Sequence, residues 1–196
     1  MQPAKTGAII LAAGYSSRMG AFKATLPVGG VPAVTRVINV FTNAGISDIA
    51  VISGYKRELL VEHIQGATEV YNANFSDGMF SSVQTGIAHF AERGFDAVWL
   101  TPADCALISV PKINSTDNII IPTYLGVDGH PVLLPNRLFP DIICYGGFGG
   151  LRGLIEQFRE FIVYTETHNT GTVLDMDTPD DYDALKRYAE SQSSSV

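Results

Sequence analysis

The sequence predicts a three-layer α/β fold, in which helices cover both faces of a mainly parallel sheet that has a small antiparallel excursion. Two observations predict it. In the first hundred residues, short strand-like runs alternate with segments whose apolar residues recur at helical spacing. After residue 115 this alternation gives way to strand-like runs separated by glycine-rich loops. The first pattern is typical of parallel strands with right-handed crossovers, and the second favours antiparallel strands.

The first half of the chain supplies most of the expected parallel sheet. Strands are expected at residues 7–11, 49–53, 68–71 and 97–100. Between them, apolar residues at helical spacing predict helices from about Val34 to Gly45, from Lys56 to Ile64 and from about Val83 to Gly94.

The second half is expected to add strands of a different arrangement. Strand-like runs occupy residues 119–121, 132–134 and 161–164, and residues 172–176 are expected to return to the sheet. A final helix is expected at 179–189, because Thr178 and Pro179 form a typical helix start. Residues 1–190 are therefore interpreted as a single domain, and residues 191–196 as a polar, flexible tail.

Composition excludes several classes of protein. The chain has 196 residues with 46% hydrophobic and 17% charged residues, which is typical of one globular domain. Its 13 basic and 20 acidic residues give a net charge of -7, which argues against partners such as nucleic acid or an anionic membrane. The apolar run before Gly14 is too short for a signal peptide, and the two cysteines argue against a disulfide framework, so we expect a cytoplasmic protein.

A glycine-containing loop, residues 11–23, follows the first expected strand. Small residues at 12–14 would let a ligand approach the backbone closely, and loop N–H groups can point toward anionic oxygens. Arg18 and Lys23 lie five positions apart, so both can reach one polyphosphate. The loop fits neither the G-x-x-x-x-G-K-[ST] nor the G-x-G-x-x-G phosphate-binding pattern.

Carboxylates stand at two expected strand ends. Asp104 follows the strand at 97–100, at the sheet edge where α/β proteins bind ligands. Mg²⁺ prefers one or two carboxylates together with phosphate oxygens and water, so Asp104 is a candidate metal ligand. Asp175 and Asp177 would share one face of an extended strand, and we expect Asp177 to be the second ligand, with Asp175 as the alternative.

The string L-A-A-G-x-S-x-R-M-G-x-x-K at 11–23 resembles the signature loop of nucleotidyltransferases. The chain is similar, over about residues 7–186, to the MobA-like NTP transferase family and its molybdenum cofactor cytidylyltransferase branch. This resemblance implies a Rossmann-like nucleotidyltransferase fold with Mg²⁺ as cofactor. It also implies that Arg18, Lys23 and Asp104 are catalytic, and that the triphosphate binds to Leu11, Ala12, Ala13, Gly14 and Ser16.

Three further segments resemble the family. Residues 72–83 match the segment that borders the base pocket, which implies nucleotide-binding roles for Asn72, Gly78, Ser81 and Ser82, although serines here are equally ordinary at a helix start. The stretch 122–132 implies that His130 lines the acceptor pocket. Arg152 is the other expected acceptor contact, but Phe148 stands where relatives often have Asp, which leaves the identity of the acceptor open.

The resemblance implies transfer of a nucleoside monophosphate, CMP from CTP by preference, to a phosphorylated acceptor such as molybdopterin, with release of pyrophosphate. The expected partners are the nucleoside triphosphate, the acceptor and a molybdenum hydroxylase apoenzyme. One alternative is an accessory maturation factor for molybdenum hydroxylases with weak or no transferase activity, and another is a sugar-phosphate nucleotidyltransferase. The sequence leaves the choice between CTP and GTP and the oligomeric state open.

Overall fold

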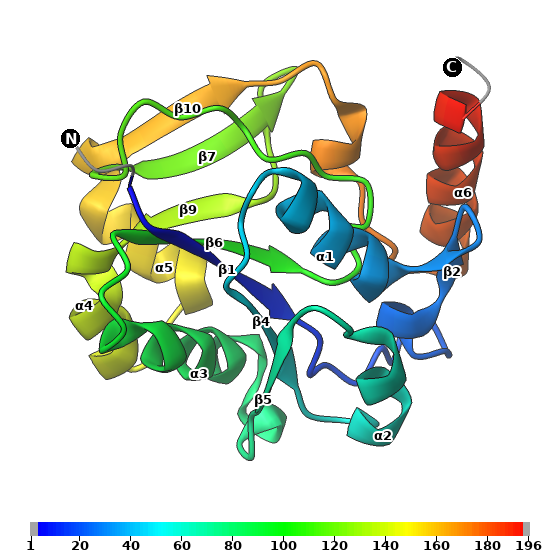
Figure 1. Ribbon diagram of the computed structural model, residues 1–196, viewed down its shortest axis with the longest axis horizontal. Helices are drawn as coiled ribbons and strands as arrows, with labels where there is room; N and C mark the ends of the chain where they lie inside the picture. Colours follow the sequence, from blue (N-terminus) through cyan, green and yellow to red (C-terminus); the bar gives the residue numbers. More distant parts are fainter. Residues whose placement is uncertain (1–3, 194–196) are drawn as a thin grey trace.

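A mixed sheet of eight strands forms the centre of the structure, a computed structural model that describes residues 4–193 (Figure 1). The strand order is β10-β7-β9-β6-β1-β4-β5, and β8 pairs with β7 alone. Four strands of this sheet come from the first half of the chain and are mutually parallel, as the sequence predicted: β1 (Thr6–Leu11), β4 (Ile49–Ser53), β5 (Thr68–Tyr71) and β6 (Ala97–Pro102).

The antiparallel excursion comes from the second half of the chain. Strand β9 (Val132–Pro135) runs antiparallel to β6 and to β7 (Ile119–Tyr124), whereas β10 (Ile162–Glu166) runs parallel to β7 at the sheet edge. Strand β8 (Val127–Asp128) adds a short antiparallel pairing on β7. The first half of the chain contributes a separate antiparallel hairpin of β2 (Pro27–Val28) and β3 (Val31–Pro32).

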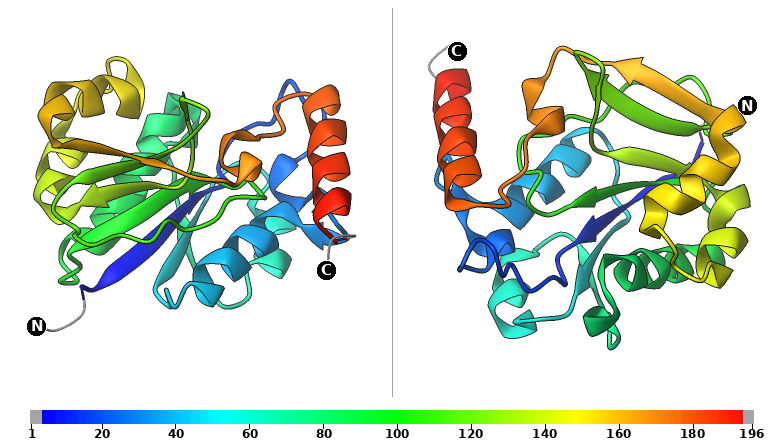
Figure 2. Two further views of the ribbon diagram at one scale, coloured as in Figure 1. Left: turned by 90° about the horizontal axis from the view of Figure 1, so that it is seen from above. Right: turned by 180° about the vertical axis from the view of Figure 1, so that it is seen from behind.

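Helices cover both faces of the sheet, which gives the three predicted layers (Figure 2). Helices α1 (Ala33–Asn43) and α2 (Arg57–Leu60) pack on one face. The other face carries α3 (Met79–Ala91), α4 (Phe139–Cys144) and α5 (Gly150–Ile155). Short 3-10 helices lie in the connections: η1 (Lys23–Thr25), η2 (Val61–His63), η3 (Phe75–Asp77), η4 (Asn136–Leu138), η5 (Glu156–Phe161) and η6 (Thr170–Val173).

Successive side chains of strand β1 point to opposite faces of the sheet and so belong to two different core clusters. Ala8 and Ile10 join the cluster under α1, while Ile9 and Leu11 join the cluster under α3. Because all four side chains are buried, β1 is held from both sides, and the loop that follows it begins from a rigid position.

The C-terminal helix α6 (Pro179–Ser193) forms a third, smaller cluster with the β2–β3 hairpin. Thr178 caps its first turn as the sequence predicted: the Thr178 hydroxyl oxygen accepts a hydrogen bond from the Asp181 N–H at 3.3 Å, and the Asp181 carboxylate in turn accepts from the Thr178 N–H at 2.9 Å. The helix continues to Ser193, so residues 191–193 of the expected tail are helical, and 194–196 lie outside the described residues.

Two element predictions need correction. Residues 172–176 do not return to the sheet: η6 occupies the start of this segment, and the Asn169 side chain caps it by accepting a hydrogen bond from Gly171 N–H at 2.9 Å. The segment is held instead by the backbone of His130, whose N–H donates to the Thr172 carbonyl at 2.9 Å. The helix expected at 56–64 is divided into α2 and η2.

Within residues 4–193, no helix has the length and apolar character needed to cross a membrane.

Helix α3 approaches strand β1 closely at Gly86. A Cβ atom built on Gly86 would lie 2.6 Å from Cγ2 of Ile9, a buried β-branched side chain with little freedom to move. We expect Gly86→Ala to lower the free energy of unfolding by about 1–2 kcal/mol, because overpacking outweighs the roughly 1 kcal/mol by which alanine favours a helix. Urea unfolding of Gly86→Ala beside Gly146→Ala, whose added Cβ would meet nothing within 4 Å, measures this. Equal stability of the two variants would contradict the packing argument.

Candidate active site

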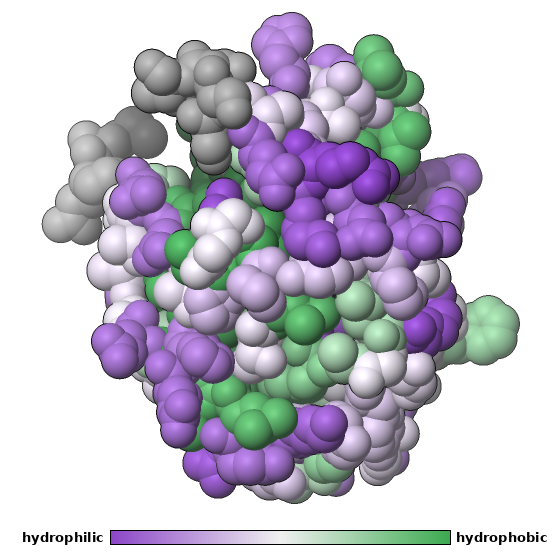
Figure 3. Space-filling view, turned by 90° about the vertical axis from the view of Figure 1, so that its right-hand side faces the viewer, coloured by the Kyte–Doolittle hydropathy of each residue, from purple (hydrophilic) through white to green (hydrophobic). Residues whose placement is uncertain are grey.

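A cavity of about 400 Å³ opens where β1 and β6 end. Its walls come from the loop after β1, from η3 and the start of α3, and from residues 102–104, and Asp177 closes one end. Figure 3 looks onto the side of the molecule to the right in Figure 1, where hydrophobic and neutral surface lies between groups of hydrophilic side chains. Because β1 and β6 are parallel and both end at this cavity, the cavity lies at the carboxyl edge of the strands, where α/β folds bind ligands.

The loop after β1 is ordered by its own backbone. Ser16 has a left-handed conformation with φ of 55°, its hydroxyl oxygen accepts a hydrogen bond from Lys23 N–H at 3.2 Å, and its carbonyl accepts from Met19 and Gly20. A Cβ at Gly14 would meet no protein atom within 4 Å, so packing within the protein does not require glycine there. The open space beside Gly14 belongs to the cavity and is available to a ligand.

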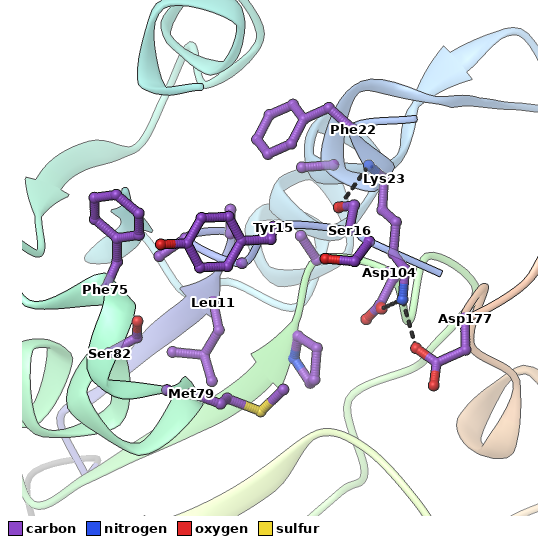
Figure 4. Close-up of a pocket in the computed structure, with 18 of the residues that line it drawn as sticks. Leu11, Tyr15, Ser16, Phe22, Lys23, Phe75, Met79, Ser82, Asp104 and Asp177 are labelled. Carbon is purple, nitrogen blue, oxygen red and sulfur yellow. Dashed lines mark hydrogen bonds and ion pairs between the residues drawn. The ribbon is translucent and has the colours of Figure 1, made fainter. Parts of the chain in front are cut away.

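Lys23 joins three distant parts of the chain at one end of the cavity (Figure 4). Its Nζ lies 3.0 Å from Oδ2 of Asp104 and 2.5 Å from Oδ1 of Asp177. Arg18 pairs with the other oxygen of Asp177 at 2.7 Å, and its side chain remains 73% exposed. The four residues expected to act on the polyphosphate and metal thus converge on one cleft.

Burial and neighbouring charges shift the pKa values of Lys23, Asp175 and Asp177. Burial opposes the charged form of Lys23, but hydrogen bonds and attraction from Asp177 and Asp104 raise its pKa overall. The hydrogen bond from Lys23, with the charge of Arg18, lowers the pKa of Asp177. Asp175 is different: reduced hydration and then the negative charges of Asp104 and Asp177 raise its pKa.

The two carboxylates suit a divalent ion that also binds phosphate. Asp104 and Asp177 both direct an oxygen at one cation, the Lys23 ammonium, so they already define a position for positive charge. Among residues 4–193 there is no group of three or more histidine, cysteine, aspartate or glutamate side chains placed to hold a metal. This donor set fits Mg²⁺, which completes its coordination with phosphate oxygens and water. Asp177, rather than Asp175, contacts Lys23 and lines the cavity.

Of the four residues expected to bind the nucleotide base, two line the cavity and two lie behind its wall. Gly78 and Ser82 line the cavity. Asn72 lies behind them, buried, and its Nδ2 donates to Ser81 Oγ at 2.8 Å and to Ser82 Oγ at 3.0 Å. Ser81 Oγ lies 2.8 Å from the carbonyls of Asn74 and Gly78, so its proton is used within the protein, and Ser81 is not part of the cavity wall. Asn72 and Ser81 therefore position the wall, whereas Ser82 faces the ligand space.

A second cavity, of about 480 Å³, adjoins the first. The two cavities share Leu11, Met79 and Pro102 as wall residues. His130 and Arg152, the two residues expected to bind the acceptor, both line the second cavity. Much of its remaining wall is apolar (Phe80, Val83, Leu100, Ile121, Val132, Leu151, Ile155 and Ile162), and two carboxylates, Asp128 and Glu156, also line it.

His130 presents a buried polar atom without a partner. Its Nδ1 is buried and makes no hydrogen bond, while its ring lines the second cavity. Burial lowers the pKa of His130, and the nearby negative charge of Asp104 offsets this only in part. The imidazole is therefore neutral at neutral pH, which suits hydrogen bonding to a ligand.

Phe148 lies at the tip of the loop that precedes α5. Its side chain is 90% exposed, and the Tyr145 hydroxyl donates to its carbonyl at 2.6 Å. Gly149, Gly150 and Arg152 line the second cavity, but Phe148 does not. The position at which relatives often carry Asp thus projects an aromatic ring into solvent.

Comparison of the sequence with known proteins identifies its family. The MobA-like NTP transferase domain matches residues 8–161, which is most of the chain. The chain belongs to the MobA-like NTP transferase family. Membership of this family makes it a nucleotidyltransferase enzyme.

Named relatives span nearly the full chain. The chain is 31% identical over 193 residues to a molybdenum cofactor cytidylyltransferase of Escherichia coli, covering 93% of this chain and 96% of that protein. It is 23% identical to the purine catabolism protein PucB of Bacillus subtilis, covering 91% and 95%. Among solved structures, a nucleotidyl transferase of Methanothermobacter superposes with a TM-score of 0.83 at 18% identity, covering 96% and 99%, which supports the fold.

Sequence reasoning missed two kinds of site residue in this transferase. Tyr15 lies in the loop at 11–23 and Phe75 in the segment at 72–83, and both line the first cavity. Met79 lines both cavities. Aromatic and thioether side chains carry no charge signal, so only their positions beside Gly14 and Gly78 could have indicated them.

The buried imidazole of His130 makes the stability of the protein depend on pH. Because its pKa is lowered on folding, the unfolded chain binds a proton below its ordinary pKa of about 6.5 while the folded protein does not, so stability falls as pH falls through this range. We expect His130→Phe to lose less stability between pH 8 and pH 5 than the unmodified protein. Urea unfolding at both pH values measures the two losses, and an equal or greater loss in the variant would contradict a neutral, buried His130.

Proposed function

We propose that this nucleotidyltransferase uses a divalent ion, Mg²⁺ by preference, to transfer a nucleoside monophosphate from a nucleoside triphosphate to a phosphorylated acceptor. The observation that carries the proposal is the junction of the two cavities. One cavity has cations and carboxylates at its end, the other holds His130 and Arg152, and both reach Leu11, Met79 and Pro102. Two substrates bound in these cavities would therefore meet at a common wall.

The residues at the charged end suit a triphosphate. Arg18 is mostly exposed and offers a guanidinium that can bind phosphate oxygens in a bidentate manner, and Lys23 offers a point charge beside it. Both cations are paired with carboxylates in the structure, so phosphate oxygens would compete for cations already in place. Neutralising the departing pyrophosphate in this way is the main contribution we assign to Arg18 and Lys23.

Asp104 and Asp177 would hold the divalent ion. Nucleotidyltransferases of this family commonly use divalent metals. When bound, such an ion supplies charge neutralisation at the phosphates that Lys23 and Arg18 also contact. The attacking acceptor phosphate is ionised near neutral pH, so the transfer requires no general base, and the neutral His130 serves to position the acceptor.

For the substrates, we favour CTP and a molybdopterin-type acceptor. The support is the 31% identity to a molybdenum cofactor cytidylyltransferase over nearly the whole chain. The largely apolar wall of the second cavity suits a heterocyclic body, Arg152 suits one anionic group, and the His130 imidazole with the carboxylates of Asp128 and Glu156 suits hydrogen-bonding groups on the ring.

We expect Asp104→Asn to reduce CTP-dependent pyrophosphate release by at least about 100-fold, because it removes a negative ligand from the metal position while keeping the side-chain shape. Lys23→Ala should reduce it by about 100-fold, comparable to the loss of one preorganised donor. A coupled pyrophosphate assay with Mg²⁺ and a molybdopterin-type acceptor measures both. The control is Asp183→Asn, which breaks only the ion pair with Lys186 on α6. Full activity of a folded Asp104→Asn protein would refute the assigned role.

A second candidate function is an accessory factor that helps to mature a molybdenum hydroxylase and transfers nucleotides weakly or not at all. The similarity to a purine catabolism protein and the exposed Phe148, in place of the family's frequent Asp, favour it. Calorimetric binding of CTP without pyrophosphate release, on addition of the acceptor, would favour this function over the transferase.

A further inference from the structure

The aromatic rings of Tyr15 and Phe75 lie at the end of the first cavity that is away from Lys23 (Figure 4). The ring centroid of Tyr15 lies 5.0 Å from that of Tyr55 and 5.6 Å from that of Phe75. Tyr15 and Phe75 line the cavity, whereas Tyr55 does not and supports Tyr15 from outside it. The Tyr15 side chain is half exposed, so a substantial part of a large ring borders open space.

These rings are held by tight packing between neighbouring loops. A Cβ on Gly54 would lie 2.7 Å from Cβ of Phe75 and 2.8 Å from Cβ of Ala13, so Phe75 can approach the loop after β1 only because residue 54 is glycine. The N–H of Tyr55 donates to the carbonyl of Ala13 at 3.1 Å. The aromatic wall is therefore set before any ligand binds, which reduces the entropy lost on binding.

The cavity thus has two chemically different ends. Arg18, Lys23 and the two carboxylates occupy one end, and the other carries aromatic faces with Ser82 nearby. The Ser82 oxygen accepts a hydrogen bond from Asn72 at 3.0 Å, which leaves its own proton for a ligand acceptor. A molecule with a polyanion at one end and a flat ring with acceptor atoms at the other is complementary to both ends.

We propose that Tyr15 and Phe75 bind the base of the nucleoside triphosphate by stacking, and that Ser82 donates a hydrogen bond to the edge of that base. This inference rests on the proposed nucleotidyltransfer and adds Tyr15 and Phe75 as substrate-binding residues. Every base has a π face, so the stack contributes affinity for nucleosides in general. Discrimination among bases then falls to the hydrogen bonds at the base edge.

The test compares two probes that share phosphates but differ in the base. Calorimetry with Mg²⁺ gives the Kd of CTP and of inorganic tripolyphosphate for the unmodified protein, for Tyr15→Ala and for Tyr15→Phe. We expect Tyr15→Ala to weaken CTP binding about tenfold, the scale of one base stacked on an aromatic side chain, and to leave tripolyphosphate binding unchanged. Tyr15→Phe keeps the ring, so its Kd for CTP should stay within about twofold.

The matched control is Tyr71→Ala. Tyr71 on β5 is 49% exposed, close to the 50% of Tyr15, but it packs under Arg57 and lines neither cavity. This variant should bind both probes as the unmodified protein does. Thermal unfolding of each variant separates a loss of base contact from a loss of fold, and Phe75→Leu, which keeps an apolar side chain beside Gly54, provides a second variant.

The outcomes separate this inference from the proposed function. If Tyr15→Ala weakens both probes equally, the ring serves only to order the loop, and the inference is overturned. An unchanged Kd for CTP in both Tyr15→Ala and Phe75→Leu also overturns it, while Mg²⁺-dependent pyrophosphate release that is lost in Asp104→Asn would still stand. Failure of the unmodified protein to bind any nucleoside triphosphate would instead refute the proposed function itself.

Discussion

The ammonium group of Lys23 is the constraint on which the site depends. It lies between carboxylates that belong to positions 81 and 154 residues further along the chain, at the end of β6 and before α6. Burial and the negative charges of Asp104 and Asp177 raise the pKa of Asp175, whereas Lys23 and Arg18 lower the pKa of Asp177, so the Lys23 ammonium offsets repulsion among the carboxylates. Lys23 therefore holds together, in the structure without ligand, the same groups that would bind a divalent ion and a polyphosphate.

The sequence predicted much of this arrangement because local patterns determine it. The loop from Leu11 to Lys23 contains its own turn residues and cations, and Asp104 directly follows a buried strand, so parallel pairing alone brings them to one edge. Strands β1 and β6 are far apart in the sequence, yet their pairing places Leu11 opposite Pro102. Convergence of the loop that carries Arg18 and Lys23 with Asp104 follows from that register, whereas Asp177 reaches the same place from outside the sheet, in the segment before α6; the chemical roles of these residues remain predictions.

What the sequence could not predict depends on contacts between segments without a local signal. The strand expected at 172–176 had suitable residues, but Asn169 and the His130 backbone supply hydrogen bonds that satisfy this segment outside the sheet. The aromatic wall needs residues 15, 55 and 75 from three loops, with Gly54 allowing their approach. Likewise, Asn72 resembles a ligand contact in the sequence, yet it is buried and orients Ser82 instead.

The two cavities differ in charge, which gives them different roles in the proposed transfer. Two cations are concentrated where the triphosphate would bind, whereas the second cavity has a largely apolar wall with a neutral imidazole, Arg152 and two carboxylates, Asp128 and Glu156. An acceptor phosphate entering from the apolar side would lose hydration before it reached the wall formed by Leu11, Met79 and Pro102, and a less hydrated phosphate interacts more strongly with fixed charges. Arg18 and Lys23 lie together on the nucleotide side, whereas among the described residues that line the acceptor side one guanidinium, Arg152, accompanies two carboxylates, so this distribution would favour charge that moves toward pyrophosphate.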